Sequence, residues 1–337
     1  MALTQVAKDS GERNFMFESV TAIAPARLHL GFLDLNGGLG RRFGSIGLAI
    51  DHPVTRLSIA RAPAPFVEGA EARRAAAYLE TLTQRLGLAR SYGVTIHEAI
   101  PDHVGLGSGT QLALALASAL RLLEGLAPDV PADALALQRS QRSGIGAGLF
   151  ERGGVIVDGG RAEGTVTPPV IARLEFPAAW RVLLVLDSRV KGLHGAQEAE
   201  SFAALGPFAA TGAAEICRLV LIKALPALAE ADLESFGGAI ERIQEIVGAY
   251  FAPAQGGAAQ TSAAVAEMLG ALRRHGAKGI GQSSWGPTGF AFAADEGEAQ
   301  RLRDLMRGEA AALGVDIAIC KGLNRGALVK GHTPAAQ

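Results

Sequence analysis

The sequence has little cysteine, no excess of charge of either sign and no long apolar run. Its 337 residues contain two cysteines, Cys217 and Cys320, which lie far apart and outside any CxxC or Cys/His cluster. A disulfide scaffold and a zinc site are therefore not expected. The 32 Lys and Arg residues balance 33 Asp and Glu residues, so the overall charge favours neither nucleic acid nor an anionic membrane as a partner. An anionic substrate would have to be held by local groups.

The lack of a long apolar run argues against a membrane protein. The most apolar stretch, residues 112–123, is closed by Glu124 and Gly125 and is too short to span a bilayer. Residues 1–20 are polar and of mixed charge, unlike a secretion signal. Because 49% of the residues are apolar, the chain has enough material for a large core. We therefore expect a soluble cytoplasmic protein with a flexible N-terminus.

Apolar periodicity predicts a mixture of helices and strands without a regular βαβ series. Residues 112–123 are apolar at almost every position and predict a buried helix, and residues 143–160 are read as a glycine-rich turn that leads into a strand. In the second half, helices and strands alternate as in an α+β layer. The other predicted strands are 21–31, 46–60, 93–99, 180–187, 289–294 and 315–320, and the other helices are 71–88, 131–140, 213–229, 233–250, 262–274 and 296–312.

A phosphate-binding loop is predicted at residues 101–111, PDHVGLGSGTQ, directly before the buried helix. Its glycines allow the backbone to approach an anion, and the free amides and dipole at the start of the helix favour negative charge. Ser108 and Thr110 add hydroxyl groups. The segment is neither a Walker A loop, which needs a following Lys-Ser/Thr, nor a dinucleotide-binding fingerprint. A tight turn that caps a buried helix is the alternative interpretation.

A second glycine-rich cluster lies at residues 279–289, GIGQSSWGPTG. It combines glycine, proline and hydroxyl groups with Trp285. A surface turn is the alternative, but an indole suits a flat ligand or the wall of a site better than an exposed loop.

A third cluster, residues 24–45, reads APARLHLGFLDLNGGLGRRFGS. Arg27 and His29 are two residues apart and so share a strand face. Arg27 suits a forked contact to phosphate, and Asp34 is the nearest carboxylate that could serve a metal. For His29 and Asp34 a capped turn is the alternative.

In chain order, the three clusters resemble the three motifs of the GHMP kinase superfamily, which includes galactokinase, homoserine kinase and mevalonate kinase. APARLHLG resembles the first motif, PDHVGLGSGTQ the phosphate loop and GIGQSSWGPTGFAF the glycine-rich third motif. The resemblance covers about residues 20–330 and implies the α+β, GHMP kinase-like two-domain fold. After residues 1–20, it divides the chain into residues 21–178, a ribosomal-S5-like N-terminal domain with the phosphate loop, and residues 179–330, a ferredoxin-like C-terminal domain. The active site would lie between them. Members of the superfamily are often dimers, which implies a homodimer.

Two departures weaken the expectation of a kinase. The kinases usually read GLGSSAA, in which the second serine helps to hold the magnesium of ATP; this chain has Gly109, followed by Thr110 and Gln111. Many kinases of the superfamily also carry an aspartate base after a glycine turn, whereas the segment RSGIGAGLFERGG offers only Glu151. Phosphoryl transfer to a hydroxyl is therefore a weaker interpretation.

Five segments together resemble the β-ribofuranosylaminobenzene 5'-phosphate synthases, a non-kinase branch of this superfamily: LHLGFLDLNG, HVGLGSGTQLALA, RSGIGAGLFERGGVIVDGG, GLHGAQEAESF and GIGQSSWGPTGFAF. The resemblance implies a decarboxylating glycosyltransferase that moves the phosphoribosyl group of phosphoribosyl pyrophosphate (PRPP) to the ring carbon of 4-aminobenzoate. CO2 and pyrophosphate would leave, Mg2+ would be the metal, and the product would serve methanopterin biosynthesis. Such an enzyme must neutralise the leaving pyrophosphate, position the nucleophile and exclude water, but it needs no strong base.

The resemblance also suggests a role for each candidate residue. Arg27, Asp34 and Arg142 are the catalytic candidates, the arginines for phosphate charge and Asp34 for Mg2+ or ribose. The pyrophosphate would be bound by Gly105, Leu106, Gly107, Ser108, Gly109 and Thr110. The candidate substrate contacts are His29, Lys191, His194, Gln282, Ser283, Ser284 and Trp285.

Other interpretations stay open. An ATP-dependent small-molecule kinase would keep the same fold and loops, and a catalytically silent protein would bind PRPP or ATP without turnover. For Lys191 and His194, a solvated loop is as consistent with the sequence as a site.

Overall fold

The structure, a computed structural model, describes residues 16–192, 200–202 and 204–333. The strands are β1 (Ser19–Asp34), β2 (Phe43–Arg61), β3 (Phe66–Gly69), β4 (Tyr92–Glu98), β5 (Val155–Asp158), β6 (Val170–Leu174), β7 (Arg181–Leu186), β8 (Lys278–Gln282), β9 (Gly289–Ala293), β10 (Asp316–Lys321) and β11 (Leu328–His332). The helices are α1 (Ala72–Leu86), α2 (Ser108–Leu123), α3 (Val130–Ala136), α4 (Ile145–Arg152), α6 (Ala210–Leu219), α7 (Leu225–Glu230), α8 (Leu233–Phe251), α9 (Ala263–Arg274) and α10 (Glu296–Leu313), with a π-helical turn at Val220–Ala224 and a 3-10 turn at Ala252–Gln255. None of these helices in the described ranges is long and apolar enough to cross a membrane.

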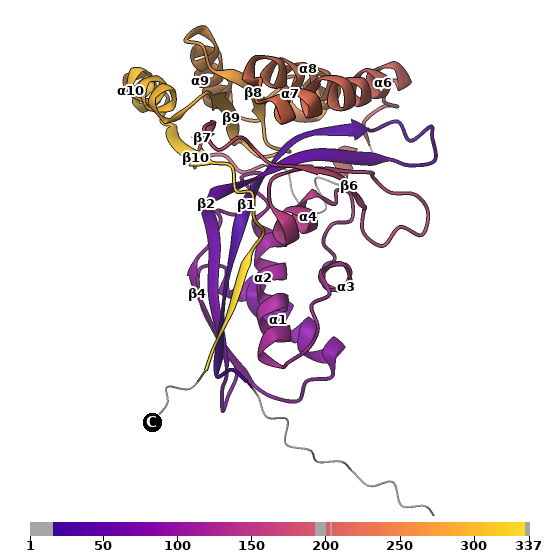
Figure 1. Cartoon of the computed structure of the whole chain (residues 1–337), viewed down its shortest axis with the longest axis vertical. Coiled ribbons are helices and arrows are strands. Elements are labelled where there is room, and N and C mark those ends of the chain that lie inside the picture. Colours follow the sequence, from indigo (N-terminus) through magenta and orange to yellow (C-terminus); the bar gives the residue numbers. More distant parts are fainter. Residues whose placement is uncertain (1–15, 193–199, 203, 334–337) are drawn as a thin grey trace, which may run out of the picture.

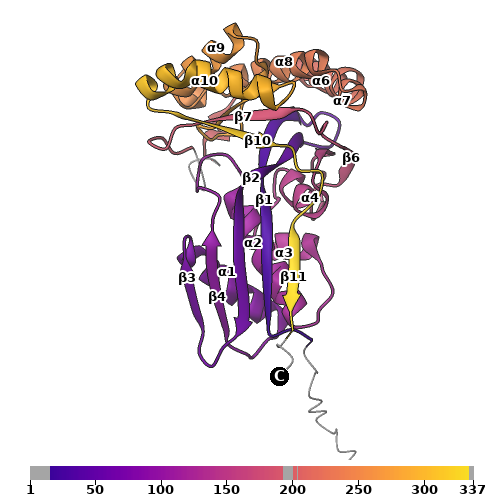
Figure 2. The same ribbon diagram turned by 60° about the vertical axis from the view of Figure 1, so that its left-hand side comes forward.

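Two sheets form the frame of the molecule (Figure 1). Within the described residues, the first has seven strands, in the order β11-β1-β2-β4-β3, with β5 paired to β2 and β6 paired to β5. The second has four strands, in the order β10-β7-β9-β8. Helices α1 and α2 lie behind the first sheet in Figure 2, while α8, α9 and α10 lie above the second. The predicted α+β class is confirmed.

Helix α4 departs from the sequence-based prediction, which was a glycine-rich turn. A Cβ on Gly148 would lie 2.5 Å from Cδ1 of Ile156, and a Cβ on Gly146 would lie 3.0 Å from Cγ2 of Thr110. The glycines therefore allow the helix to pack closely on β5 and α2. The prediction was wrong because glycine was read as a turn residue, whereas here it removes side-chain bulk.

The last strand returns to the first sheet. β11 pairs antiparallel with β1, from Ser19 opposite His332 to Ile23 opposite Leu328. The two ends of the described chain therefore lie side by side, as Figure 2 shows. The domain boundaries at 178 and 330 stay a prediction, but the chain crosses back into the N-terminal sheet before it ends.

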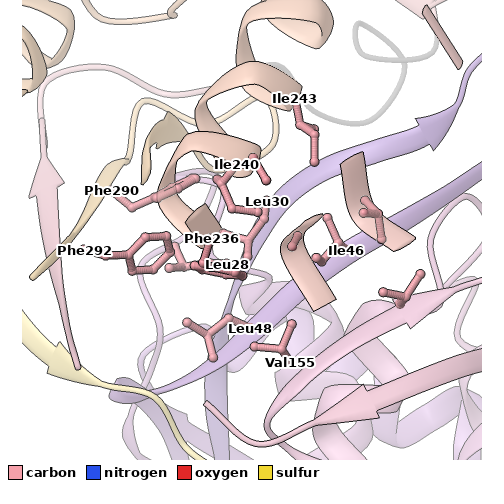
Figure 3. Close-up of a cluster of buried hydrophobic side chains, with 14 of the residues drawn as sticks. Leu28, Leu30, Ile46, Leu48, Val155, Phe236, Ile240, Ile243, Phe290 and Phe292 are labelled. Carbon is pink, nitrogen blue, oxygen red and sulfur yellow. The ribbon is translucent and has the colours of Figure 1, made fainter. Parts of the chain in front are cut away.

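A continuous apolar core joins the two halves. Figure 3 shows side chains of β1, β2 and β5 meeting those of α8 and β9, and all are buried: Leu28, Leu30, Ile46, Leu48, Val155, Phe236, Ile240, Ile243, Phe290 and Phe292. Complete burial of each such side chain is worth about 1.5–3 kcal/mol. This shared core holds the two sheets against each other, so the loops at their junction keep fixed relative positions.

Candidate active site

A cavity of about 570 Å³ lies at this junction. Its walls come from β1, from the phosphate loop and first turn of α2, from the segment between α3 and α4, and from the second glycine-rich cluster, residues 279–289. Three segments that were singled out in the sequence are thus brought together with a fourth. The cavity is the candidate active site because it gathers these loops around one volume.

Strand β1 places Arg27 and His29 on the cavity wall. Its pairing with β2 is interrupted between Pro25 and Ala26 and again between His29 and Gly31, so two irregularities flank the pair. Such bulges re-aim side chains next to functional sites. The Nη1 atom of Arg27 donates to the carbonyl oxygen of Gly105 at 2.8 Å, and its backbone amide donates to Leu106 O at 3.1 Å. Arg27 therefore braces the phosphate loop as well as lining the cavity.

The phosphate loop and the second glycine-rich cluster, residues 279–289, interlock through their backbones. Gly105 has φ +87°, and a Cβ there would lie 2.2 Å from the carbonyl oxygen of Ser283. A Cβ on Gly286 would lie 2.1 Å from the carbonyl carbon and oxygen of Val104. The Ser283 hydroxyl accepts from the amide of His29 at 3.0 Å and donates to Gly105 O at 2.7 Å. Only glycine permits this approach.

The start of α2 offers its amides to the cavity. Gly107, at φ +81°, precedes the helix, and in the described structure no side chain caps it. Arg27, His103, Arg139 and Arg142 line the same cavity, and no Asp or Glu of the described residues does so. Helix dipole and guanidinium groups together make this end of the cavity suited to an anion.

The cavity also has an aromatic wall. Phe32 and Trp285 line the cavity, and Trp285 packs on Phe202 and Phe251 with ring centroids 5.1 Å and 4.4 Å away. His29 lies 4.4 Å from Phe32, ring to ring. The cavity therefore has a cationic end and an aromatic wall, which suits a ligand pair with phosphate on one member and a flat ring on the other.

Several buried polar atoms around the cavity have no hydrogen-bond partner within the described part of the chain. They are Nε2 of His29, Nε1 of Trp285, Oγ of Ser140 and Nε of Arg139. Buried polar groups are nearly always paired, by a ligand or water if not by protein. Four cavity residues also have left-handed backbones, with φ between 55° and 58°: His103, Gln138, Ser140 and Ser284. Such conformations gather at binding sites.

His29 is a neutral imidazole at physiological pH. Its burial, together with the charge of Arg27, lowers its pKa to about 3. Nε2 can therefore exchange hydrogen bonds with a ligand without adding charge. The ring is suited to orient a substrate group, and not to neutralise phosphate.

Comparisons with known proteins identify the family. The chain is 35% identical to a β-ribofuranosylphenol 5'-phosphate synthase of Archaeoglobus fulgidus over 66% of this chain and 74% of the relative. It is 30% identical to a protein of the same name from Methanothermobacter thermautotrophicus, over 78% of this chain and 85% of the relative. The chain belongs to the β-ribofuranosylphenol 5'-phosphate synthase family. It is therefore an enzyme.

Family models and solved structures show how this synthase family is built. The model of the GHMP kinases N-terminal domain matches residues 72–148, and that of the GHMP kinases C-terminal domain matches residues 224–311. Homoserine kinase from Cytophaga hutchinsonii superimposes with a TM-score of 0.65 at 16% identity, over 97% of this chain and all of that one. Mevalonate diphosphate decarboxylase from Staphylococcus aureus gives 0.64 at 15% identity, over 94% and 98%. The GHMP kinase-like fold is confirmed, and at these identities the two solved structures show similarity in fold alone.

Most of the residues predicted for the site line the cavity. They are Arg27, His29, Gly105, Gly107, Ser108, Gly109, Thr110, Arg142, Ser284 and Trp285. Leu106, Gln282 and Ser283 do not line it; Leu106 is buried, and the two polar side chains brace the loops, with Gln282 accepting from the amide of Thr261 at 2.6 Å. Their predicted ligand contacts stay predictions.

Two other predicted residues, Asp34 and Lys191, do not line the cavity, and a third lies outside the described residues. The carboxylate of Asp34 accepts from the amides of Asn36 and Gly37 at 2.7 and 3.0 Å, which is the capped turn named as its alternative. Lys191 pairs with Asp102 at 3.2 Å and is largely exposed. His194 lies outside the described residues. In the described ranges no cluster of three His, Cys, Asp or Glu residues could hold a metal, so Asp34 as a Mg2+ ligand stays a prediction.

Sequence reasoning missed Arg139, His103 and Phe32, which line the cavity. The signal available for Arg139 was the polar run QRSQRSG between two helices, in which two arginines alternate with Gln and Ser. For His103, the position inside the phosphate loop was the signal. Nothing local distinguished Phe32 from any other apolar residue of a buried strand.

Proposed function

We propose that this enzyme transfers the ribosyl 5-phosphate group of PRPP to the ring carbon of a para-substituted benzoate, with release of CO2 and pyrophosphate. One observation carries the proposal. The start of α2, three arginines from other segments and the aromatic wall around Trp285 line the same cavity. A site with both features can hold a pyrophosphate and an aromatic ring in contact. Membership of the synthase family supports the same reaction.

The reaction balances without an external base. The bond between C1 of the ribose and the pyrophosphate oxygen breaks, and its electron pair leaves with pyrophosphate. The ring carbon that bears the carboxylate forms the new bond to C1. The bond from that carbon to the carboxylate then breaks, its electron pair restores the aromatic ring, and CO2 leaves. No substrate hydroxyl has to lose a proton, which agrees with a cavity without Asp or Glu among its described lining residues.

The residues present would act by charge and position. The amides at the start of α2 and the arginine side chains stabilise the negative charge that develops on the leaving pyrophosphate. Trp285 and Phe32 hold the ring against C1 and exclude water. The neutral His29 presents Nε2 to the para substituent of the benzoate, where a hydrogen bond fixes which ring carbon faces the ribose.

Two para-substituted benzoates are candidates for the acceptor. The sequence resemblance implied 4-aminobenzoate. The word phenol in the names of the relatives favours 4-hydroxybenzoate as a second candidate. Both carry an electron-donating group opposite the carboxylate, so both can attack through the same carbon.

We propose that Mg2+ binds to the phosphates of PRPP and enters the site with it. No carboxylate among the described residues lines the cavity, so the protein's side chains there do not fit a metal site of their own. Mg2+ commonly keeps several waters and binds substrate phosphates, and PRPP would bring it as a complex. Cytoplasmic location and a homodimer belong to the same proposal.

Release of labelled CO2 tests the reaction. The purified enzyme with Mg2+, PRPP and carboxyl-labelled 4-aminobenzoate or 4-hydroxybenzoate is expected to release CO2 and pyrophosphate in equal amounts, each only when both substrates are present. The acceptor with the higher kcat/KM is the preferred substrate. Absence of CO2 with both acceptors, under conditions in which ATP is consumed, would instead support a kinase. Binding of PRPP without turnover would support a silent binding protein.

Replacing Arg27 with alanine is expected to lower kcat/KM for PRPP. The change removes the 2.8 Å hydrogen bond to Gly105 O and a positive charge at the cavity. A charge-assisted hydrogen bond is worth about 1.5–3 kcal/mol, or roughly 10- to 150-fold in kcat/KM for PRPP. Arg56→Ala on the adjacent strand, which lines a different cavity, is the matched control. An unchanged kcat/KM in Arg27→Ala would remove Arg27 from the site.

A further inference from the structure

Two arginines converge over Gly109, in the first turn of α2. A Cβ at this position would lie 3.1 Å from Nη1 of Arg139 and 3.8 Å from Nη1 of Arg74. Gly109 is the position at which the kinases that this chain resembles usually carry a serine. Here a guanidinium group lies where that side chain would project. The φ of Gly109 is an ordinary helical one, so the backbone does not require glycine there. The close guanidinium group of Arg139 does favour glycine, because it leaves little room for a side chain.

Arg139 lies in the segment after α3 and is held in place by Tyr78 of helix α1. Its Nη2 donates to the hydroxyl oxygen of Tyr78, and its guanidinium lies 5.3 Å from the centre of the Tyr78 ring. The residues on either side, Gln138 and Ser140, both have left-handed backbones. The Nε atom of Arg139 is buried and has no partner among the described residues. The side chain is therefore fixed by the protein while part of its donor capacity remains unused.

Arg74 approaches from helix α1. Its Nη1 lies 3.1 Å from Oε2 of Glu71, and its Nη2 lies 3.4 Å from Nε2 of His103. His103 lines the cavity and has φ +57°. Two separate parts of the chain, helix α1 and the segment after α3, thus bring guanidinium groups to the first turn of α2, and His103 Nε2 accepts from one of them.

We propose that Arg139, which lies in the space that the missing side chain of Gly109 leaves and has Arg74 behind it, binds the leaving pyrophosphate at the start of α2. The inference rests on the proposed function and assigns this subsite to residues 74, 109 and 139. As the bond between C1 and oxygen breaks, the electron pair moves onto the pyrophosphate, and the guanidinium groups and the amides of α2 meet that charge together. A side chain at position 109 would push Arg139 away from the helix. Gly109 and Arg139 therefore act as a pair.

Calorimetric titration with inorganic pyrophosphate tests the subsite directly. We expect Arg139→Gln to raise the Kd for pyrophosphate about tenfold or more, because a charge-assisted contact is lost. Gly109→Ser is expected to raise the Kd for pyrophosphate to a similar extent, although it removes no charge. Arg139→Lys should fall between wild type and Arg139→Gln, because it keeps the charge and loses the planar fork. Arg73→Gln, on the exposed side of the same helix turn, is the control and should bind as wild type.

Titrations in EDTA and in Mg2+ extend the test. If the guanidinium groups supply the cationic contact, wild type binds pyrophosphate in EDTA and Arg139→Gln loses most of that binding. Wild-type affinity in Arg139→Gln, or in Gly109→Ser, would overturn the proposal. The Kd for pyrophosphate can be measured without turnover, since an enzyme that releases no CO2 with either benzoate can still be titrated with pyrophosphate. Thermal unfolding of each variant identifies one that has lost its fold, in which case Arg139→Lys and Gly109→Ser decide.

Discussion

Replacing Gly286 with alanine is expected to abolish activity and to destabilise the enzyme strongly. The added Cβ would lie 2.1 Å from the carbonyl group of Val104 and 2.3 Å from the amide nitrogen of Gly105. Both contacts are with backbone, so no side-chain rotation can relieve them. Overpacking typically costs about 1–3 kcal/mol and occasionally more, and we expect the upper end of that range here because the neighbours are backbone atoms. Urea unfolding measures the loss of stability, and PRPP-dependent CO2 release measures the loss of the site.

The reciprocal change and a matched control sharpen this prediction. Gly105→Ala meets the carbonyl oxygen of Ser283 at 2.2 Å and should reproduce the effect from the other loop. Gly308→Ala, in the middle of α10, meets nothing within 4 Å and should be neutral or stabilise by up to about 1 kcal/mol through helix propensity. Wild-type stability and activity in Gly286→Ala would mean that the two loops do not interlock.

Replacing Trp285 with alanine is expected to cost about 3 to 5 kcal/mol of unfolding free energy. The indole is 3% exposed and packs on both Phe202 and Phe251, so its removal opens a large void. Because the same ring lines the cavity, binding of the aromatic acceptor is expected to weaken as well. Equilibrium unfolding and the KM for the benzoate measure the two consequences separately.

Phenylalanine variants separate packing from substrate contact. Trp285→Phe keeps an aromatic ring but removes the Nε1 donor, which is buried without a partner in the described chain; the KM for the acceptor should rise while most of the stability is retained. Trp180, buried between Phe176 and Phe236 and away from the cavity, provides the control. Trp180→Phe should lose stability without changing that KM. An acceptor KM that moves equally in both variants would argue against Trp285 as part of the acceptor site.

The parts of the fold and site that were predictable from the sequence are those with a local signature. The phosphate loop was recognisable because glycines directly precede an apolar helix, and α2 indeed begins at Ser108. Arg27 and His29 were expected together because a strand places alternate residues on one face, and both line the cavity. In each case the relevant neighbours lie within a few residues along the chain.

The parts that were not predictable depend on contacts between distant segments. The glycines of α4 were read as a turn because their packing partners, Thr110 and Ile156 among them, are not visible in a local window. The place of Arg139 in the site depends on its contacts with Gly109 and Tyr78, which lie on two other elements. Asp34 is a local case: its oxygen accepts from the amides of its own turn, which the sequence analysis named as the alternative, and its role as a Mg2+ ligand stays a prediction.

The pairing of β11 with β1 has a consequence for biosynthesis. A ribosome makes β1 before the other described strands and β11 after them, so the N-terminal sheet keeps an open edge along residues 19–23 until residues 328–332 have been made. An unpaired edge invites wrong pairing with other chains, and the growing chain is exposed to that hazard until β11 emerges. The same arrangement leaves the described ends adjacent, at Ser19 and His332. A short peptide could therefore join them, and new ends could be opened in a surface loop far from the cavity, giving a permuted enzyme in which the edge is closed early.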